Sequence, residues 1–174
     1  MAPPPIDPRT VKGTWIRHVP HGAELLGRAD TPTDGRSQLG EIVPALYLAD
    51  TIATATAEWY RSLAELGLSP QDHIPYDHHR WHVDLELADL SDIERLHSVK
   101  PDPPRPSRST WHACQRVGQL LWREGWAGPI APSAARPGSL IACVFAADWP
   151  PTGCTPLDAS TVESIPPPPQ GMTT

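Results

Sequence analysis

Three charged side chains occupy positions where a folded chain can use them for chemistry. Glu58 directly precedes Trp59 in a stretch rich in Ala, Leu and Glu, beside rather than opposite its apolar face. A carboxylate there points partly into the protein, where fixed negative charge can stabilise a developing positive charge. Arg17 and Arg36 carry guanidinium forks that match phosphate groups and stay charged. From the residues alone, a helix-surface carboxylate paired with Arg61 or Arg17 is the competing interpretation.

A dense histidine cluster at residues 76–82 is the second candidate for chemistry. His78 and His82 would meet on a helix and could then hold zinc. Pro75 precedes the cluster, however, and the alternation after it indicates a strand, on which Arg80 lies between the two histidines. The chain also has no HExxH motif and no paired cysteines. We therefore expect no metal, and we expect these histidines to be solvated.

Hydrophobic periodicity predicts the elements that position these residues. Helices are expected over residues 52–66, which carry Glu58, over 92–97 and over 111–124. Strands are expected over residues 14–19, 45–49, 79–87, 129–133 and 139–146, and a long irregular loop over 21–41. Asp50 or Thr51 offers an N-cap for the first helix, and Gly67 is placed to end it. The mixed order predicts one α/β (α+β) domain with a compact mixed β-sheet core.

Proline content sets the expected boundaries of that domain. The chain has 174 residues and 23 prolines, far above the usual share of about 5%. Runs of proline favour extended, solvated backbone. We expect a Pro-rich N-terminal tail at residues 1–12, a folded domain at 13–150 and a Pro-rich C-terminal tail at 151–174, with an exposed loop at 101–106.

Charge and cysteine usage exclude several classes of protein. The formal net charge is −6 and there is no basic run, so we expect no direct nucleic acid binding. Three cysteines without a CxxC pair indicate reduced thiols and a cytoplasmic location. The chain begins with no signal peptide and has no apolar run of about 18 residues, so we expect no membrane association.

Four stretches, in matching order and spacing over roughly residues 13 to 148, resemble the RES-domain family, which is named for a recurring Arg, Glu and Ser. They are residues 15–17, residues 35–36 followed by 44–50 and the Ala57-Glu58 pair, residues 111–118, and residues 125–138. The resemblance implies an ADP-ribosyltransferase-like RES fold. It also implies NAD as substrate, degraded by hydrolysis or by phosphorolysis with inorganic phosphate, and a cognate Xre-like antitoxin as partner.

The same resemblance implies roles for individual side chains. Loss of nicotinamide leaves an oxocarbenium-like ribose, which Glu58 would stabilise. Arg17 and Arg36 would bind the diphosphate, and Tyr47 would orient the ring. Ser133 would contact a phosphate or a ribose hydroxyl, and Gln115 would contact an amide or a hydroxyl.

Two alternative functions remain open at this point. The chain could transfer ADP-ribose onto a protein target, which shares the first half of the mechanism. It could also be a catalytically silent binding module, because Ser37 stands after the Gly-Arg pair where the family usually has an aromatic residue. The acceptor in the NAD reaction, water or phosphate, is not given by the residues.

Overall fold

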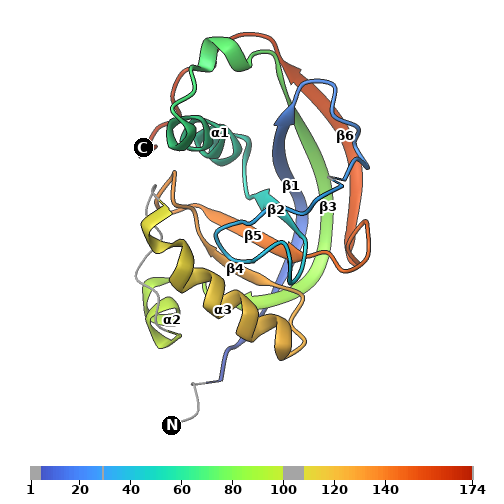
Figure 1. Ribbon diagram of the computed structural model, residues 1–174, viewed down its shortest axis with the longest axis vertical. Helices are drawn as coiled ribbons and strands as arrows, with labels where there is room; N and C mark the ends of the chain where they lie inside the picture. The colour runs from blue at the N-terminus through green and yellow to red at the C-terminus, as the bar shows by residue number, and fades with distance from the viewer. Residues whose placement is uncertain (1–4, 29, 100–107, 174) are drawn as a thin grey trace.

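The computed structural model describes residues 5–28, 30–99 and 108–173 (Figure 1). Over these residues the chain forms six strands, three α-helices and two short 3-10 helices. The strands are β1 (Pro8–Pro20), β2 (Ala45–Ala49), β3 (Tyr76–Asp89), β4 (Pro129–Pro132), β5 (Leu140–Phe145) and β6 (Cys154–Val162). The helices are α1 (Ile52–Leu66), α2 (Ile93–Ser98) and α3 (Trp111–Arg123), with η1 (Pro70–His73) and η2 (Arg108–Thr110).

One mixed sheet organises the molecule, in the order β1-β2-β5-β4-β3-β6 with an additional β1–β3 pairing. Long antiparallel β1 and β3 pair along their whole length, with Arg17 opposite His79. The pairing of β3 with β4 is parallel, and the others are antiparallel. Because β1 contacts β2 as well as β3, the first five strands close on themselves and enclose a core. The expected mixed-sheet α/β domain is confirmed.

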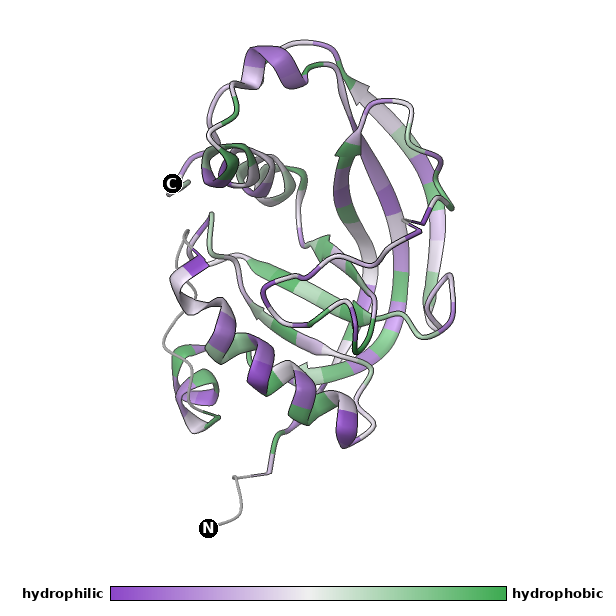
Figure 2. Cartoon of the chain, in the orientation of Figure 1, coloured by the Kyte–Doolittle hydropathy of each residue, from purple (hydrophilic) through white to green (hydrophobic). Residues whose placement is uncertain are grey.

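The largest hydrophobic core lies between these strands. Trp81, Val83 and Leu87 of β3 are fully buried there, together with Leu46 and Leu48 of β2. Figure 2 shows hydrophobic colour along β2 and β5 and an alternation along β3, as expected for a strand with one face in the core. A second cluster packs Val117 and Leu121 of α3 against the end of the sheet. These two cores fix the strand ends and helices that carry the polar residues described below.

Helix α1 has the bounds that the sequence predicts, because both of its caps form. The Thr51 hydroxyl accepts a hydrogen bond from the backbone N–H of Thr54 over 3.1 Å. Gly67 ends the helix in the left-handed conformation with φ +65°, which favours glycine. Trp59 is buried and stacks on Tyr76 at 4.3 Å between ring centroids, which anchors α1 to the start of β3.

The folded region extends into both segments expected to be tails. Strand β1 begins at Pro8 rather than at residue 14, and its first residues pair with the end of β3. Residues 154–162 form β6, which pairs with Tyr76–Val83 of β3. The boundaries expected at residues 13 and 150 therefore do not delimit the sheet. These strand segments were not expected because prolines lie in and next to them. Pairing with the long strand β3 specifies both segments, rather than a local sequence pattern. The loop expected at 101–106 lies outside the described residues.

The histidine cluster is a strand, but two of its histidines are buried, which corrects the expectation that they are solvated. His78 and His79 are only 4% and 3% exposed, whereas Arg80 and His82 are exposed. Burial lowers the pKa of both imidazoles, although Asp77 nearby acts in the opposite direction. The turn after β1 closes over this part of β3, where His21 and Gly22 hydrogen-bond to Asp77.

Candidate active site

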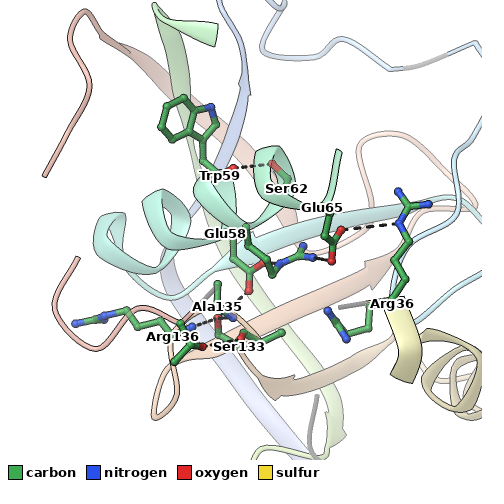
Figure 3. Close-up of polar contacts among 12 residues, drawn as sticks. Arg36, Glu58, Trp59, Ser62, Glu65, Ser133, Ala135 and Arg136 are labelled. Atoms are coloured by element: carbon green, nitrogen blue, oxygen red, sulfur yellow. Dashed lines mark hydrogen bonds and ion pairs between the residues drawn. The ribbon is translucent and has the colours of Figure 1, made fainter. Parts of the chain in front are cut away.

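Glu58 lies on α1 at the edge of the packed face. Neighbouring helix residues are about 100° apart, so burial of Trp59 leaves the Glu58 side chain pointing beside the core rather than into solvent. That side chain is 13% exposed. Its Oε1 accepts a hydrogen bond from the Ser133 hydroxyl over 2.7 Å, and its Oε2 accepts one from Nε of Arg61 over 2.6 Å (Figure 3). Both carboxylate oxygens are therefore held in one orientation.

The ion pairs around Glu58 keep its carboxyl group charged. Burial raises the pKa of Glu58, but Arg61 and the hydrogen bond from Ser133 outweigh it, and the net pKa is lowered. Arg61 also pairs with Glu65 on the next turn of α1. Burial lowers the pKa of Arg61, but Glu58 and Glu65 raise it by more than burial lowers it, so the net pKa is raised. Arg61 thus has two anionic partners and Glu58 one cationic partner.

Ser133 follows β4 in a tight turn that leads toward β5. Its Oγ accepts hydrogen bonds from the backbone N–H groups of Ala135 over 3.2 Å and Arg136 over 3.0 Å. A hydroxyl has one proton to donate, and these two acceptor contacts leave that proton for Glu58. Ser133 is 3% exposed, so the arrangement is buried. The turn therefore presents Ser133 to the carboxylate as a hydrogen-bond donor.

The loop that carries Arg36 is held by the side chain of Tyr47. The Tyr47 hydroxyl accepts a hydrogen bond from the backbone N–H of Ser37 over 2.9 Å and donates to Oε1 of Gln38 at 3.4 Å. Burial raises the pKa of Tyr47 well above its usual value. A Cβ at Gly35 would lie 2.3 Å from the same hydroxyl, so only glycine fits there. This contact explains why Gly precedes Arg36.

Helix α3 supports the same loop from the other side. Gln115 is 9% exposed and donates from Nε2 to the carbonyl of Gly35 over 2.9 Å. A Cβ at Gly118 would lie 1.7 Å from the carbonyl oxygen of Ser37, so the glycine allows the helix to touch the loop. The Gln115 amide nitrogen is therefore occupied in holding the loop.

Arg36 is only partly satisfied within the described chain. Its Nη1 donates to the Thr110 hydroxyl over 2.8 Å, and its guanidinium lies 5.9 Å from the Trp111 ring centroid. Among the described residues, no hydrogen-bond acceptor meets its buried Nη2. Burial lowers the pKa of Arg36, and nearby Arg61 adds to the effect. An unpaired buried guanidinium N–H is costly, and an anionic ligand would satisfy it.

Arg17 and His18 lie at the end of β1 that passes α1. Among the residues the structure describes, none forms an ion pair or hydrogen bond with the Arg17 guanidinium. Burial lowers the pKa of Arg17. Burial also lowers the pKa of His18 to about 4, with Glu58 acting in the opposite direction, so this imidazole is neutral at pH 7. Consecutive strand residues face opposite sides of a sheet, and Arg17 also lines a third cavity, of about 70 Å³, with Arg28 and Trp149.

Two cavities meet at Glu58. The first, of about 160 Å³, is mostly apolar; the residues lining it include Arg36, Trp111, Leu96 and Val117. The second, of about 230 Å³, is lined by Arg17 and His18 among others. Four residues line both cavities: Tyr47, Glu58, Arg61 and Ile141. The charged carboxylate thus lies where the cavity lined by Arg36 adjoins the cavity lined by Arg17.

The fold therefore brings most of the candidate residues together. Arg17, Arg36, Tyr47 and Glu58 line the two cavities. Gln115 and Ser133 do not line them in the described structure, but each hydrogen-bonds to a residue that does.

Among the cavity residues that were not singled out from the sequence as site residues, two carry groups that bear on Glu58, namely Arg61 and His18. Arg61 lies three residues after Glu58 on a helix. This spacing predicts an ion pair between the two side chains, but it does not predict that Arg61 lines a cavity. His18 directly follows Arg17, and no sequence pattern distinguished it from an ordinary strand residue.

Within residues 5–28, 30–99 and 108–173, no group of three or more His, Cys, Asp or Glu side chains is arranged to hold a metal ion. In the same ranges, none of the helices has the length and apolar character needed to cross a bilayer.

Comparisons with known proteins concern the family and the fold of the chain. The family model described as "RES domain" matches residues 14–158, which is most of the chain. A crystal structure of the M. tuberculosis MbcT-MbcA toxin-antitoxin complex has a similar fold, with a TM-score of 0.72 and 21% sequence identity. The match covers 88% of this chain and 87% of that chain. Comparison with curated proteins gives no match.

Proposed function

The chain belongs to the RES-domain family, and we propose that it cleaves the bond between nicotinamide and ribose in NAD. The observation that carries the proposal is the ionised Glu58 carboxylate between two cavities, one lined by Arg36 and the other by Arg17. NAD has the complementary pattern, with a ribose that becomes cationic beside a diphosphate and an aromatic base at each end. Such a substrate spans both cavities.

In the proposed reaction Glu58 stabilises the positive charge that develops on the ribose. The carbon–nitrogen bond breaks, and its electron pair stays on the nicotinamide nitrogen, which loses its positive charge and needs no proton. The ribose carbon becomes oxocarbenium-like, and a carboxylate fixed beside it lowers the barrier. An oxygen of water or phosphate then bonds to that carbon, and a water-derived acceptor releases its proton to solvent.

The two free guanidinium groups would hold the diphosphate. Arg17 has no anionic partner among the described residues, and Nη2 of Arg36 has no acceptor there. Guanidinium forks bind phosphate oxygens in pairs, and their charge does not depend on pH in the physiological range. Tyr47 lines both cavities, where its ring edge can orient the nicotinamide, while its hydroxyl remains on the loop.

Ser133 and Gln115 would contribute through contacts that they already make. Ser133 donates to Glu58 over 2.7 Å. With substrate bound, its hydroxyl would share this proton between Glu58 and a ribose hydroxyl or the acceptor. Gln115 uses its amide nitrogen on Gly35, which leaves its carbonyl oxygen for a substrate amide or hydroxyl. No metal takes part in this proposal.

The biological role that fits this activity is that of a toxin in a toxin–antitoxin pair. The similar fold in the MbcT-MbcA complex supports this role, since that structure holds a toxin with its antitoxin. NAD consumption in the cytoplasm would stop growth unless a partner covers the site. We propose an Xre-like antitoxin as that partner.

The test is product analysis with purified protein and NAD, in buffers with and without inorganic phosphate. Hydrolysis should release nicotinamide and ADP-ribose in both buffers. Phosphorolysis should release nicotinamide and the phosphorylated form of ADP-ribose only in the buffer with phosphate. The exposed Glu86→Gln variant is the matched control for charge removal and should behave as the parent. Label from NAD that ends on protein would replace the proposal with ADP-ribosyl transfer, and absence of any nicotinamide release would leave a binding module.

A further inference from the structure

The C-terminal segment, defined here as residues 163–173, lies after β6 and beyond the region that matches the family model. It returns toward α1 (Figure 1). The Tyr60 hydroxyl of α1 donates to the carbonyl of Pro166 over 2.5 Å. Thr173 then donates from its backbone N–H to the carbonyl of Ala135 over 2.7 Å. The segment therefore joins α1 to the turn that contains Ser133.

The side chain of Arg136 contacts the C-terminal segment, α1 and the end of the turn that contains Ser133. Its Nε donates to the carbonyl of Gln170 in the C-terminal segment over 3.1 Å. Its Nη1 donates to the hydroxyl of Ser139 over 3.0 Å and to that of Thr54 on α1 at 3.3 Å. Its backbone N–H donates to Oγ of Ser133 over 3.0 Å. A planar guanidinium can hold several acceptors at fixed angles, which a point charge cannot.

These contacts determine where the Ser133 hydroxyl points. In Figure 3 the turn with Ser133, Ala135 and Arg136 lies directly opposite Glu58 of α1. Because Ser133 Oγ accepts from two backbone N–H groups of this turn, a shift of the turn moves the proton that Ser133 donates to Glu58. We propose that Arg136 is a positioning residue which, with the C-terminal segment, clamps this turn and so sets the Ser133–Glu58 hydrogen bond.

The inference rests on the proposed function for its effect on catalysis, but not for its effect on Glu58 itself. The hydrogen bond from Ser133 lowers the pKa of Glu58, so a loosened turn should raise that pKa. The pKa can be read from the carboxyl resonance of Glu58 by carbon NMR, with Glu58→Gln to assign the signal. This readout does not need turnover, and a general loss of stability does not by itself move it.

The experiment compares the parent with Arg136→Ala, Arg136→Lys and a chain that ends at Ser164. Exposed Arg116→Ala is the control for removal of an arginine, and Tyr60→Phe removes only the Pro166 contact. We expect Arg136→Ala and the shortened chain to raise the Glu58 pKa and to lower kcat for nicotinamide release about tenfold, with KM for NAD little changed. Arg136→Lys should lie between Arg136→Ala and the parent.

The outcomes separate the two proposals. If the parent releases no nicotinamide, the proposed function fails, while the NMR comparison still tests the clamp. If folded Arg136→Ala and the folded shortened chain both keep the parent's Glu58 pKa, the clamp is contradicted, whatever the parent does with NAD. A change in thermal stability alone, without the pKa change, also counts against it.

Discussion

Nε of Arg61 lies 2.6 Å from Oε2 of Glu58, on the carboxylate oxygen that Ser133 does not contact. The two residues are three apart on α1, and both line the two cavities. Arg61 is therefore both the partner that keeps Glu58 charged and a wall of the site. A carboxylate held this way is already oriented before any substrate arrives, which is the condition for preorganised electrostatic stabilisation.

Replacement of Arg61 should shift the pH dependence of catalysis. Burial raises the pKa of Glu58 and Arg61 lowers it, so Arg61→Gln leaves the burial effect less opposed and the Glu58 pKa rises. Activity that needs ionised Glu58 should then be lost at a higher pH than in the parent as the solution is acidified. Rate–pH profiles of nicotinamide release measure this, with Arg61→Lys as the charge-keeping control. If Arg61→Gln and the parent lose activity at the same acidic pH, Arg61 does not act electrostatically on Glu58.

His18 should make folding stability depend on pH between about 6.5 and 4. Its folded pKa is lowered to about 4, so in this window the unfolded chain binds a proton that the folded chain does not. The stability contributed by neutral His18 is complete above the unfolded pKa and is lost as pH falls through the window, by at most about 3 kcal/mol.

Urea unfolding of the parent and of His18→Gln at pH 7 and pH 5 measures this contribution. The parent should lose more stability than the variant between the two pH values. His78 and His79 have lowered pKa values in both proteins, so their effect cancels in the difference. Equal losses in the two proteins would place His18 in a solvated environment.

Tyr47→Phe tests whether the tyrosine hydroxyl holds the Arg36 loop. The change removes the acceptor for the backbone N–H of Ser37 and should cost about 1–3 kcal/mol of unfolding free energy. Tyr60→Phe, which removes the hydroxyl that donates to Pro166 of the C-terminal segment, is the matched control and should leave hydrogen exchange at Ser37 unchanged. Denaturant unfolding measures both, and faster hydrogen exchange at Ser37 should accompany the loss. Unchanged exchange there would mean that other contacts hold the loop.

Arg17→Ala should weaken binding of compounds that contain the diphosphate. ADP, titrated by calorimetry, should bind about tenfold to a hundredfold more weakly than it binds the parent, since one charge-assisted contact is lost. Nicotinamide, which has no phosphate, should bind both proteins alike. Exposed Arg123→Ala is the control for net charge. If ADP binds the variant as tightly as the parent, Arg17 does not contact the diphosphate.

Elements with strong local signals could be predicted from the sequence. Residues 45–49 and 52–66 have the observed bounds, because an apolar run and two helix caps specify them locally. Strand β6 could not be predicted, because its exposed, polar residues show no alternation and pairing with β3 alone defines it. Thr110, the residue before α3, forms no capping hydrogen bond with its side chain, and its hydroxyl accepts from Arg36, a partner 74 residues away.

The candidate site followed a similar division. Glu58, Arg17 and Tyr47 could be named because each lies in a short stretch that resembles the family. The clamp by Arg136 and the turn that directs Ser133 could not be named, because they depend on contacts with residues distant along the chain. Burial of His78 was missed for the same reason, since its ring packs against Tyr76, which stacks on Trp59 of α1.

The most direct test compares Glu58→Gln with the parent, first for NAD binding and then for nicotinamide release. Glutamine keeps the size of the side chain but removes the negative charge and one of the two acceptor oxygens, so it can accept from only one of Ser133 and Arg61. The variant should bind NAD with an affinity close to that of the parent and release nicotinamide about a hundredfold to a thousandfold more slowly. A variant that releases nicotinamide at the parent's rate would contradict the central claim that the Glu58 charge stabilises the cationic ribose.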